Sequence, residues 1–252
     1  MTRPSDDPLF QRLNEILARE VGHASRENLH ATSPDALLLR GIVRDRVGGF
    51  FSNAYPPNAP GVCGVCRGPS DSGLCGPCEG TRRGFGDLLA DRTILLTYAI
   101  GNMPGGRHQS AHHMLTYKGY RGTPPVHECS EDLQLMISVM VDMHRTCLQS
   151  WLGHPWDALT FVPSKERPDA THPVAALANA TLPKFNFAAA PTPKFLMRPG
   201  PGSDIKRKMT ADRFEVDVQW RERVDGKHVL IVDDTRNRDH PMYSAMVALG
   251  LG

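Results

Sequence analysis

Four cysteines near the end of the first third of the chain limit what this segment can fold into. They form two C-x-x-C pairs separated by eight residues: Cys63, Cys66, Cys75 and Cys78. Two thiolates three residues apart on a glycine-containing turn can reach one ion, and two such turns supply the tetrahedral set of four sulfurs that Zn²⁺ prefers. The glycines and prolines between them offer little core, so metal binding would replace hydrophobic burial. We therefore predict a structural zinc ribbon over residues 56–84.

Three alternatives remain open for this cysteine cluster: an iron–sulfur centre, a pair of redox dithiols, or a site that no longer loads metal. The other two cysteines, Cys129 and Cys147, are isolated, and the N-terminal segment MTRPSDDPLF has no apolar core typical of an export signal. We therefore expect a cytoplasmic protein without disulfides. Three arginines near the cluster are candidates for contact with nucleic acid, although solvated surface is their more common role: Arg67, Arg82 and Arg83.

The composition is that of a globular protein. The 252 residues suffice for one large domain, or for a medium domain with a small appendage. Apolar residues make up 40% and charged residues 22%, and the net charge of +2 creates no field that demands an anionic partner. No apolar run approaches the roughly 20 residues that a membrane-spanning helix needs. We expect no membrane segment.

Helical and strand patterns alternate along the chain. Apolar spacing predicts helices over 6–20, 34–46, 131–152 (with Ser130 as its cap), 172–180 and 242–250. Apolar runs or alternation predict strands over 93–100, 157–164, 213–220 and 228–234. This order favours an α/β fold with an open sheet, in which ligands bind beyond the carboxyl ends of the strands. The polar residues of "FVPS" and "IVDD" lie at that edge.

The order of these features resembles the ComF-like (competence protein F, amidophosphoribosyltransferase-like) phosphoribosyltransferases over roughly residues 62–251. The segments that carry the resemblance are the cysteine cluster, "LTYKGYR" (115–121), "VPSKERPDATHP" (162–173), "KRKMTADRFEV" (206–216) and "VLIVDDT" (229–235). In the fourth segment Arg213 follows Thr210 by three residues, where the family has four. The resemblance implies a type I phosphoribosyltransferase fold over 85–252, a mainly parallel twisted sheet flanked by helices. Residues 1–55 would form an N-terminal helical extension.

The resemblance also implies binding of phosphoribosyl pyrophosphate (PRPP) or another phosphorylated sugar, together with Mg²⁺. The acidic pair, Asp233 and Asp234, would hold the ribose hydroxyls, directly or through the metal, and carboxylates would stabilise positive charge on the ribose as pyrophosphate departs. Lys165 and Arg167 would neutralise that leaving group. The Ser164 hydroxyl would contact phosphate, because no G-x-S-x-G turn marks it as a nucleophile.

The segment after the acidic pair departs from the family. The resemblance assigns phosphate binding to Thr235, Arg236, Asn237 and Arg238, but relatives have small residues and glycine here, whose N–H groups wrap the 5′-phosphate. In this chain Asp239 adds a negative charge and Pro241 removes an N–H. Loss of PRPP binding is one explanation. The other is a pair of compensating frame shifts, since codons CGG-AAC-CGG-GAC-CAC-CCN read one base later encode Gly-Thr-Gly-Thr-Thr. The chain also ends at Gly252, where relatives usually continue through at least one more strand, so we expect an incomplete C-terminal edge.

Two classes of function follow. The first is an enzyme that transfers ribose 5-phosphate to an unidentified N-nucleophile, and the second is a non-catalytic zinc-ribbon module that binds DNA or a competence-protein partner. The N-terminal helix would pack on the catalytic domain or form a homodimer. His108 and His112 have metal-ligand spacing for a helix but lack an acidic third ligand, and the basic run 203–209 is either a solvated loop or a closure over pyrophosphate.

Overall fold

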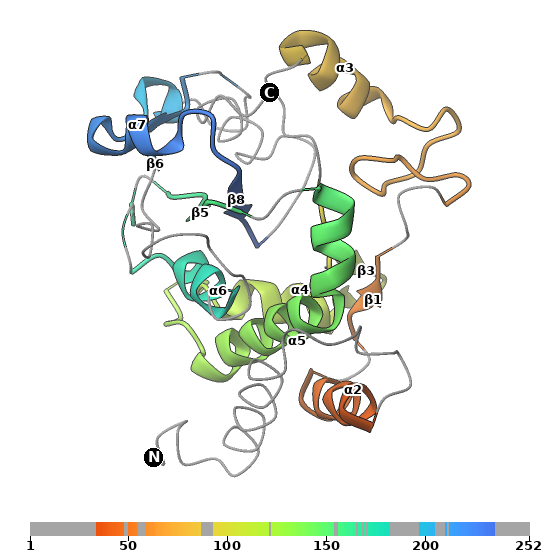
Figure 1. Ribbon diagram of the computed structural model, residues 1–252. Coiled ribbons are helices and arrows are strands. Elements are labelled where there is room, and N and C mark those ends of the chain that lie inside the picture. The colour runs from red at the N-terminus through yellow and green to blue at the C-terminus, as the bar shows by residue number, and fades with distance from the viewer. Residues whose placement is uncertain are drawn as a thin grey trace.

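The computed structural model describes residues 34–47, 50–54, 59–86, 93–120, 122–153, 156–164, 166–167, 169, 171–181, 197–204, 210 and 212–234. Within these residues helices and short strands alternate (Figure 1). The helices predicted over 6–20 and 242–250 lie outside them. So does most of the basic run 203–209. None of the helices in the described ranges combines the length and apolarity needed to cross a bilayer.

One pair of strands in the described part of the chain is parallel. β5 (Ala158–Phe161) and β8 (Val229–Val232) run side by side, in a register that pairs Ala158 with Val229 and Phe161 with Val232. All four residues of β5 are buried, whereas in β8 only Val232 is. The predicted α/β class is therefore confirmed as a mixed α/β structure with a small parallel sheet.

Three further strand pairs are antiparallel. β1 (Ser52–Asn53) pairs with β2 (Thr97–Tyr98), β3 (Asn102–Met103) with β4 (Gly106–Arg107), and β6 (Met197–Pro199) with β7 (Phe214–Val216). The strand predicted over 93–100 is therefore only two residues long. The strand predicted over 213–220 ends at Val216, because the side chain of Asp217 accepts the N–H of Gln219 and starts the helical turns η5 (Val218–Trp220) and α7 (Arg221–Val224).

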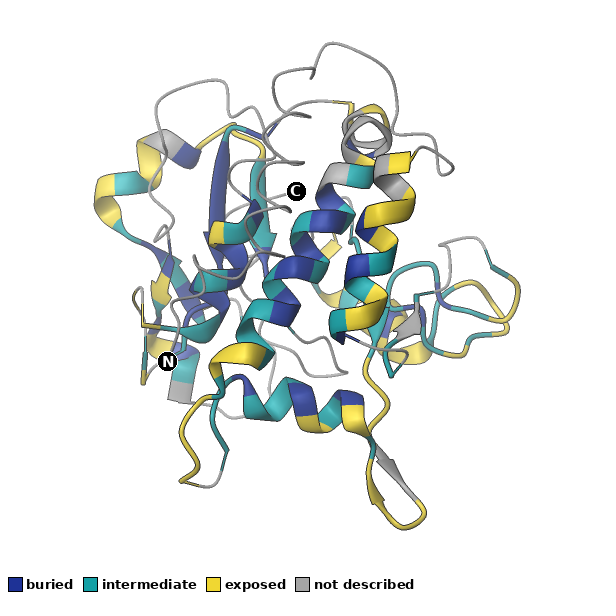
Figure 2. Cartoon of the chain, turned by 90° about the horizontal axis from the view of Figure 1, so that it is seen from below, coloured by how far each residue is buried: buried dark blue, intermediate teal, exposed yellow. Residues whose placement is uncertain are grey.

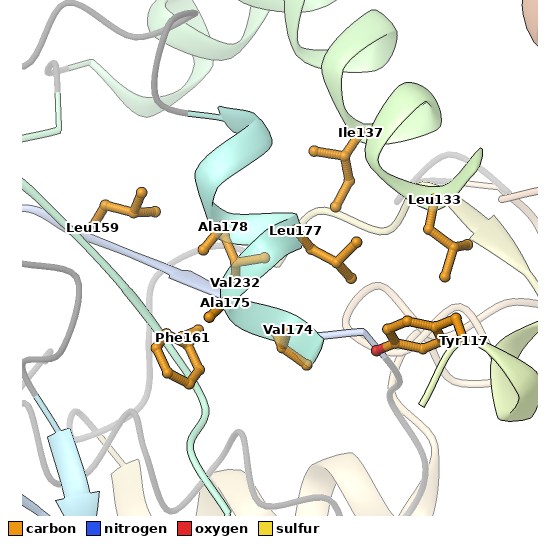
Figure 3. Close-up of a cluster of buried hydrophobic side chains, with 10 residues drawn as sticks. All are labelled: Tyr117, Leu133, Ile137, Leu159, Phe161, Val174, Ala175, Leu177, Ala178 and Val232. Atoms are coloured by element: carbon orange, nitrogen blue, oxygen red, sulfur yellow. The ribbon is translucent and has the colours of Figure 1, made fainter. Parts of the chain in front are cut away.

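A helical layer covers the parallel pair. α6 (Pro173–Thr181) contacts both strands and packs on its other side against α5 (His127–Leu152), as Figure 3 shows. The main core joins these elements through ten buried side chains: Tyr117, Leu133, Ile137, Leu159, Phe161, Val174, Ala175, Leu177, Ala178 and Val232. Each of the larger ones contributes about 1.5–3 kcal/mol on leaving water. Figure 2 shows buried residues on the inner sides of the helices and exposed ones outside.

Two more helices flank α5. α2 (Pro34–Val47), close to the predicted range, packs Leu39 and Ile42 against Leu135 and Val139 of α5. α4 (Gln109–Thr116) precedes the turn that carries Tyr117. The predicted start of α5 at its Ser130 cap is wrong: the N–H of Ser130 already donates to the carbonyl of Val126, so the helix begins one turn earlier.

The hairpin of β6 and β7 generates a stability prediction. The N–H of Gly200 donates to the carbonyl of Arg213 at 2.8 Å, and a Cβ added there would overlap the carbonyl oxygen of Asp212. Because backbone atoms cannot rotate away, Gly200→Ala should lower the free energy of unfolding by about 1–3 kcal/mol. Gly41→Ala in α2, where no atom lies within 4 Å, should instead raise it by about 0.5–1 kcal/mol. Urea denaturation measures both, and a Gly200→Ala variant as stable as the parent would contradict the close approach.

Candidate functional site

The cysteine cluster has the geometry of a four-sulfur metal site. The Sγ atoms of Cys63, Cys66, Cys75 and Cys78 all lie within 4.8 Å of one another. Sulfurs bound to one zinc ion at 2.3 Å in tetrahedral geometry stand about 3.8 Å apart, and the Sγ atoms of Cys66 and Cys75 are 3.5 Å apart. In the described part of the chain, this is the group of metal-ligating side chains that comes close enough to share an ion. The cysteines can hold a metal ion, as the sequence predicted.

Backbone geometry holds the first pair of cysteines in place. The N–H of Cys63 donates to the carbonyl of Gly68 and that of Arg67 to the carbonyl of Cys63, closing a tight turn in which Arg67 has a φ of 58°. The Sγ of Cys63 accepts the N–H groups of Val65 and Cys66 at 3.5 Å. Burial acts to raise the pKa of the Cys63 thiol, but the neighbouring backbone N–H groups outweigh it and lower the pKa to about 6. A thiolate, the form that binds metal, is therefore favoured at this position.

The second pair of cysteines is positioned by a helix. Cys75 is the N-cap of α3 (Gly76–Phe85), and Cys78 lies buried within its first turn. This module lies at the edge of the molecule in Figure 1 and contacts the segment that contains β2. There the Tyr98 hydroxyl donates to the carbonyl of Arg67 at 2.8 Å, and the buried Arg67 guanidinium donates to the carbonyl of Thr93 at 3.5 Å. Arg67 is therefore part of the contact between the cysteine module and the rest of the chain rather than exposed surface.

The acidic pair lies at the carboxyl end of β8, beside a cavity of about 310 Å³. α5 packs mainly against α6, and the cavity is lined by residues of α5, β8 and the segment 93–99. Its lining is mostly apolar and includes the following residues: Phe51, Leu96, Met114, Met136, Ile137, Met140, Trp156 and Leu230. Asp233 and Asp234 also line it. Carboxylates at the edge of an apolar, concave site are typical of a ligand pocket.

The carboxylate of Asp234 is bound from inside the chain. Its side chain is 2% exposed, and its Oδ2 accepts both the hydroxyl of Tyr117 and the ammonium of Lys118. Burial acts to raise the pKa of Asp234. The positive charge of Lys118, together with the hydrogen bonds from Lys118 and Tyr117, outweighs burial and lowers the pKa below its ordinary value. Burial and the charge of Asp234 raise the pKa of Tyr117, so the phenol stays a hydrogen-bond donor. Asp233 lies next to this group, with its Oδ1 accepting the N–H of Asp234 at 2.9 Å.

The loop after β5 approaches the same place. The Ser164 hydroxyl accepts the N–H of Arg167 at 3.2 Å, which closes the loop on itself. His172, at the start of α6, stacks on Phe161 with ring centroids 5.5 Å apart. Burial lowers the pKa of His172 to about 4, and the cations Lys118 and Arg167 add to this effect. Arg167 and Lys118 therefore lie near one imidazole, at the edge where the acidic pair ends β8.

Several predicted site residues can now be placed. Asp233, Asp234, Ser164 and Arg167 come from segments far apart in the sequence and gather at one end of the β5–β8 pair. Lys165 and the residues after the acidic pair (Thr235, Arg236, Asn237 and Arg238) lie outside the described residues. His108 is the N-cap of α4, with an extended backbone rather than a helical one, and its Nδ1 shares a 2.8 Å hydrogen bond with the Ser110 hydroxyl.

Three residues of this site were not assigned from the sequence: Tyr117, Lys118 and His172. All three lie in segments that carried the family resemblance, "LTYKGYR" and "VPSKERPDATHP". The side chains of Tyr117 and Lys118 reach across 117 and 116 positions of the chain to one carboxylate. No local pattern in the sequence encodes such a contact. The adjacent Tyr117 and Lys118 in "LTYKGYR" were nevertheless a usable signal that this segment supplies hydrogen-bond donors to the site.

The residues at the acidic pair do not fit Mg²⁺ at Asp234. Mg²⁺ requires oxygen ligands at about 2.0–2.1 Å in an octahedral arrangement and keeps several waters. Asp234 is 2% exposed and its Oδ2 already carries an ammonium and a hydroxyl donor. A divalent cation at this oxygen would lie against Lys118.

Comparison of the chain with protein-family models, with curated proteins and with solved structures produced no match.

The partly buried imidazole of His172 makes stability depend on pH. Its pKa in the folded chain is about 4, against an ordinary value of 6.5, so between these pH values the unfolded chain binds a proton that the folded chain does not. The stability associated with the neutral ring is complete above about pH 6.5 and is lost as the pH falls toward 4. Solvent screens this partly exposed ring and reduces the effect of the pKa shift, so His172→Gln should remove an acid-range loss of stability on the order of 2 kcal/mol.

Urea unfolding of the parent and of His172→Gln across this pH range measures the difference. The variant should lose less stability between about pH 6.5 and 4, while the two curves stay parallel above about pH 7, where both states hold a neutral ring. If the stability of the parent and of the variant falls equally with pH in the acid range, the pKa of His172 is the same in the folded and unfolded chains, and the prediction is wrong.

Proposed function

We propose that this chain is a phosphoribosyltransferase-like protein with a zinc ribbon, and that it binds PRPP or another phosphorylated sugar beyond the carboxyl ends of β5 and β8. One observation carries the proposal. The acidic pair and the Ser164–Arg167 loop follow two strands that are parallel and directly paired. In open α/β sheets this edge is where ligands bind.

The residue types suit transfer of a ribosyl group. As the bond between the anomeric carbon and the pyrophosphate oxygen breaks, the electron pair leaves with pyrophosphate and the ribose becomes positively charged. Asp233 is the carboxylate that would stabilise this charge, since Asp234 is already paired with Lys118. Arg167 would bind the departing phosphates. An N-nucleophile (ammonia, an amine or a base) would then form the new bond and release a proton.

Zinc is the ion proposed for the cysteine cluster. Four protein sulfurs complete its coordination, so the site is closed and its role structural. Metal there would fix the turn that contains Arg67, and through it the contact with Tyr98. Iron–sulfur and dithiol chemistry remain the alternatives that a metal analysis separates.

A non-catalytic module is the second candidate, and two observations favour it. Asp234 is neutralised by Lys118 within the chain, and the segment 236–241 has no glycine to wrap a phosphate. If the chain is a non-catalytic module, the exposed Arg82 and Arg83 of α3 would contact DNA or a competence-protein partner. Self-association through residues 1–55 and a cytoplasmic location stay predictions.

Calorimetric titration of the full chain with PRPP, with and without Mg²⁺, tests the sugar site. We expect micromolar binding that weakens by roughly tenfold or more in Asp233→Asn, since a hydrogen bond to a charged group is lost. Asp45→Asn, at an exposed aspartate on α2, is the matched control and should bind as the parent does.

A loop variant separates the two candidate functions. It carries Arg236→Gly, Asn237→Thr, Arg238→Gly, Asp239→Thr and His240→Thr, which recreate a family-like phosphate turn. Binding by the parent favours the enzyme, whereas binding by the loop variant alone favours the scaffold. If neither protein binds PRPP, the proposed sugar site is wrong.

Metal analysis tests the ribbon. The purified chain should contain one zinc ion, and Cys75→Ser should lose it together with thermal stability, because a structural zinc site contributes folding energy directly. Cys129→Ser is the matched control, since this half-buried cysteine on α5 lies outside the cluster. Iron in the parent, or zinc retained by Cys75→Ser, would refute a four-sulfur zinc site.

A further inference from the structure

We infer that the ammonium of Lys118 takes the place of a divalent cation at the acidic pair, so that Asp234 binds no metal ion while Lys118 is present. The inference deepens the proposed function and rests on it for the role of the site as a sugar pocket. It concerns a residue that the sequence did not single out. Of the two expectations for the acidic pair, that it holds the ribose hydroxyls directly or through Mg²⁺, it excludes the second at Asp234.

The contacts of Asp234 form a closed group. Oδ2 accepts from the Tyr117 hydroxyl and from Lys118 Nζ, two donors that come from consecutive residues. The carboxylate is 2% exposed while the lysine side chain is 35% exposed, so the lysine covers the carboxylate from the solvent side. Its Nζ also lies 5.7 Å from the centre of the Tyr117 ring, within reach of a cation–π interaction.

The backbone after α4 holds Lys118 at this position. The N–H of Tyr117 donates to the carbonyl of His113, and that of Lys118 to the carbonyl of Leu115. Gly119 follows with a φ of +80°, and a Cβ there would come within 2.9 Å of the carbonyl oxygen of Thr123. The conformation of this turn therefore requires glycine at position 119. The backbone from which the Lys118 side chain extends to Asp234 is held in place by this turn.

Electrostatics make the lysine and a metal alternatives. An ion bound to Oδ2 at about 2.1 Å would stand within a few ångströms of Nζ. At that separation and in a buried site, repulsion between a divalent ion and an ammonium is strong, because water screens it poorly. The pair of Asp234 and Lys118 is instead neutral, and its partly exposed ammonium can donate a hydrogen bond to a ligand. Such a pair suits neutral hydroxyl groups, as on a sugar, without a bridging metal.

Titration with Mn²⁺ alone, followed by the electron paramagnetic resonance signal of the free ion, tests the inference on the zinc-loaded full chain. The parent should show no binding that depends on Asp234. Lys118→Met removes the charge and keeps an apolar stem, so it should gain Mn²⁺ affinity of roughly tenfold or more, as expected when a like charge a few ångströms away is removed. Lys118→Arg is the matched control, since it keeps the charge and should not gain binding.

The double variant Lys118→Met/Asp234→Asn shows whether the Mn²⁺ binding gained by Lys118→Met occurs at Asp234. It removes both charges of the pair and should lose the Mn²⁺ binding that Lys118→Met acquires. Thermal unfolding gives a second measurement: Mn²⁺ should raise the melting temperature of Lys118→Met but not of the parent. If Lys118→Met does not fold, the parent and Asp234→Asn decide by themselves, and equal, weak Mn²⁺ binding by both supports the inference.

Two outcomes would overturn it. One is Mn²⁺ binding by the parent that disappears in Asp234→Asn, and the other is a folded Lys118→Met with no gain. A failure of PRPP to bind is a separate result, since it would remove the sugar from the proposal while leaving the competition between Lys118 and the metal measurable.

Discussion

A buried carboxylate at the end of β8 is the constraint that organises this site. Asp234 cannot stay charged at 2% exposure without partners, because an uncompensated buried charge costs several kcal/mol. Its partners come from the turn after α4, so that turn must lie against the carboxyl end of β8. Once there, Tyr117 completes the core formed by α5, α6 and the strand pair (Figure 3). A buried ion pair adds little net stability compared with apolar packing. The ion pair instead determines which segments lie together, namely the turn after α4 and the carboxyl end of β8.

Part of this arrangement was predictable because the determinants are local. The extents of α2 and α6, the strands β5 and β8, and the two cysteine pairs follow from periodicity, apolar runs and spacing within a few residues. The start of α5 was missed because Ser130 suits a cap but lies inside the helix. β2 and β7 were predicted too long, because apolar residues alone reveal neither where the partner strand of β2 ends nor that Asp217 starts a helical turn after β7. The contact of Asp234 with Lys118 depends on tertiary packing alone, which no spacing in the sequence records.

The cysteine module shows how a small segment can be fixed without a core of its own. Cys63 and Cys78 are its buried sulfurs, and the turn between them uses an uncommon positive φ at Arg67. This conformation is unfavourable for a non-glycine residue and persists only where the surroundings hold it. Here the carbonyl of Arg67 accepts the Tyr98 hydroxyl, and its guanidinium reaches Thr93. The segment 93–99, which contains Thr93 and Tyr98, forms part of the cavity wall, and Cys66 also lines the cavity. A metal in the module would therefore stabilise one wall of the cavity as well as the module itself.

The two adjacent aspartates are not equivalent, and this difference bears on what the site can do. Asp234 is bound to an ammonium and a phenol, so its charge is already balanced within the chain. Asp233 holds the turn by accepting the N–H of Asp234 and lines the cavity next to it. Neighbouring acidic groups in different surroundings commonly take different roles. In the proposed sugar site, a positively charged intermediate would meet the carboxylate of Asp233 beside the ion pair of Asp234 and Lys118, and an apolar cavity strengthens such electrostatic interactions by excluding water. The two carboxylates would therefore contribute differently to the proposed function: Asp234 fixes Lys118 in place, and Asp233 lies beside that ion pair at the cavity.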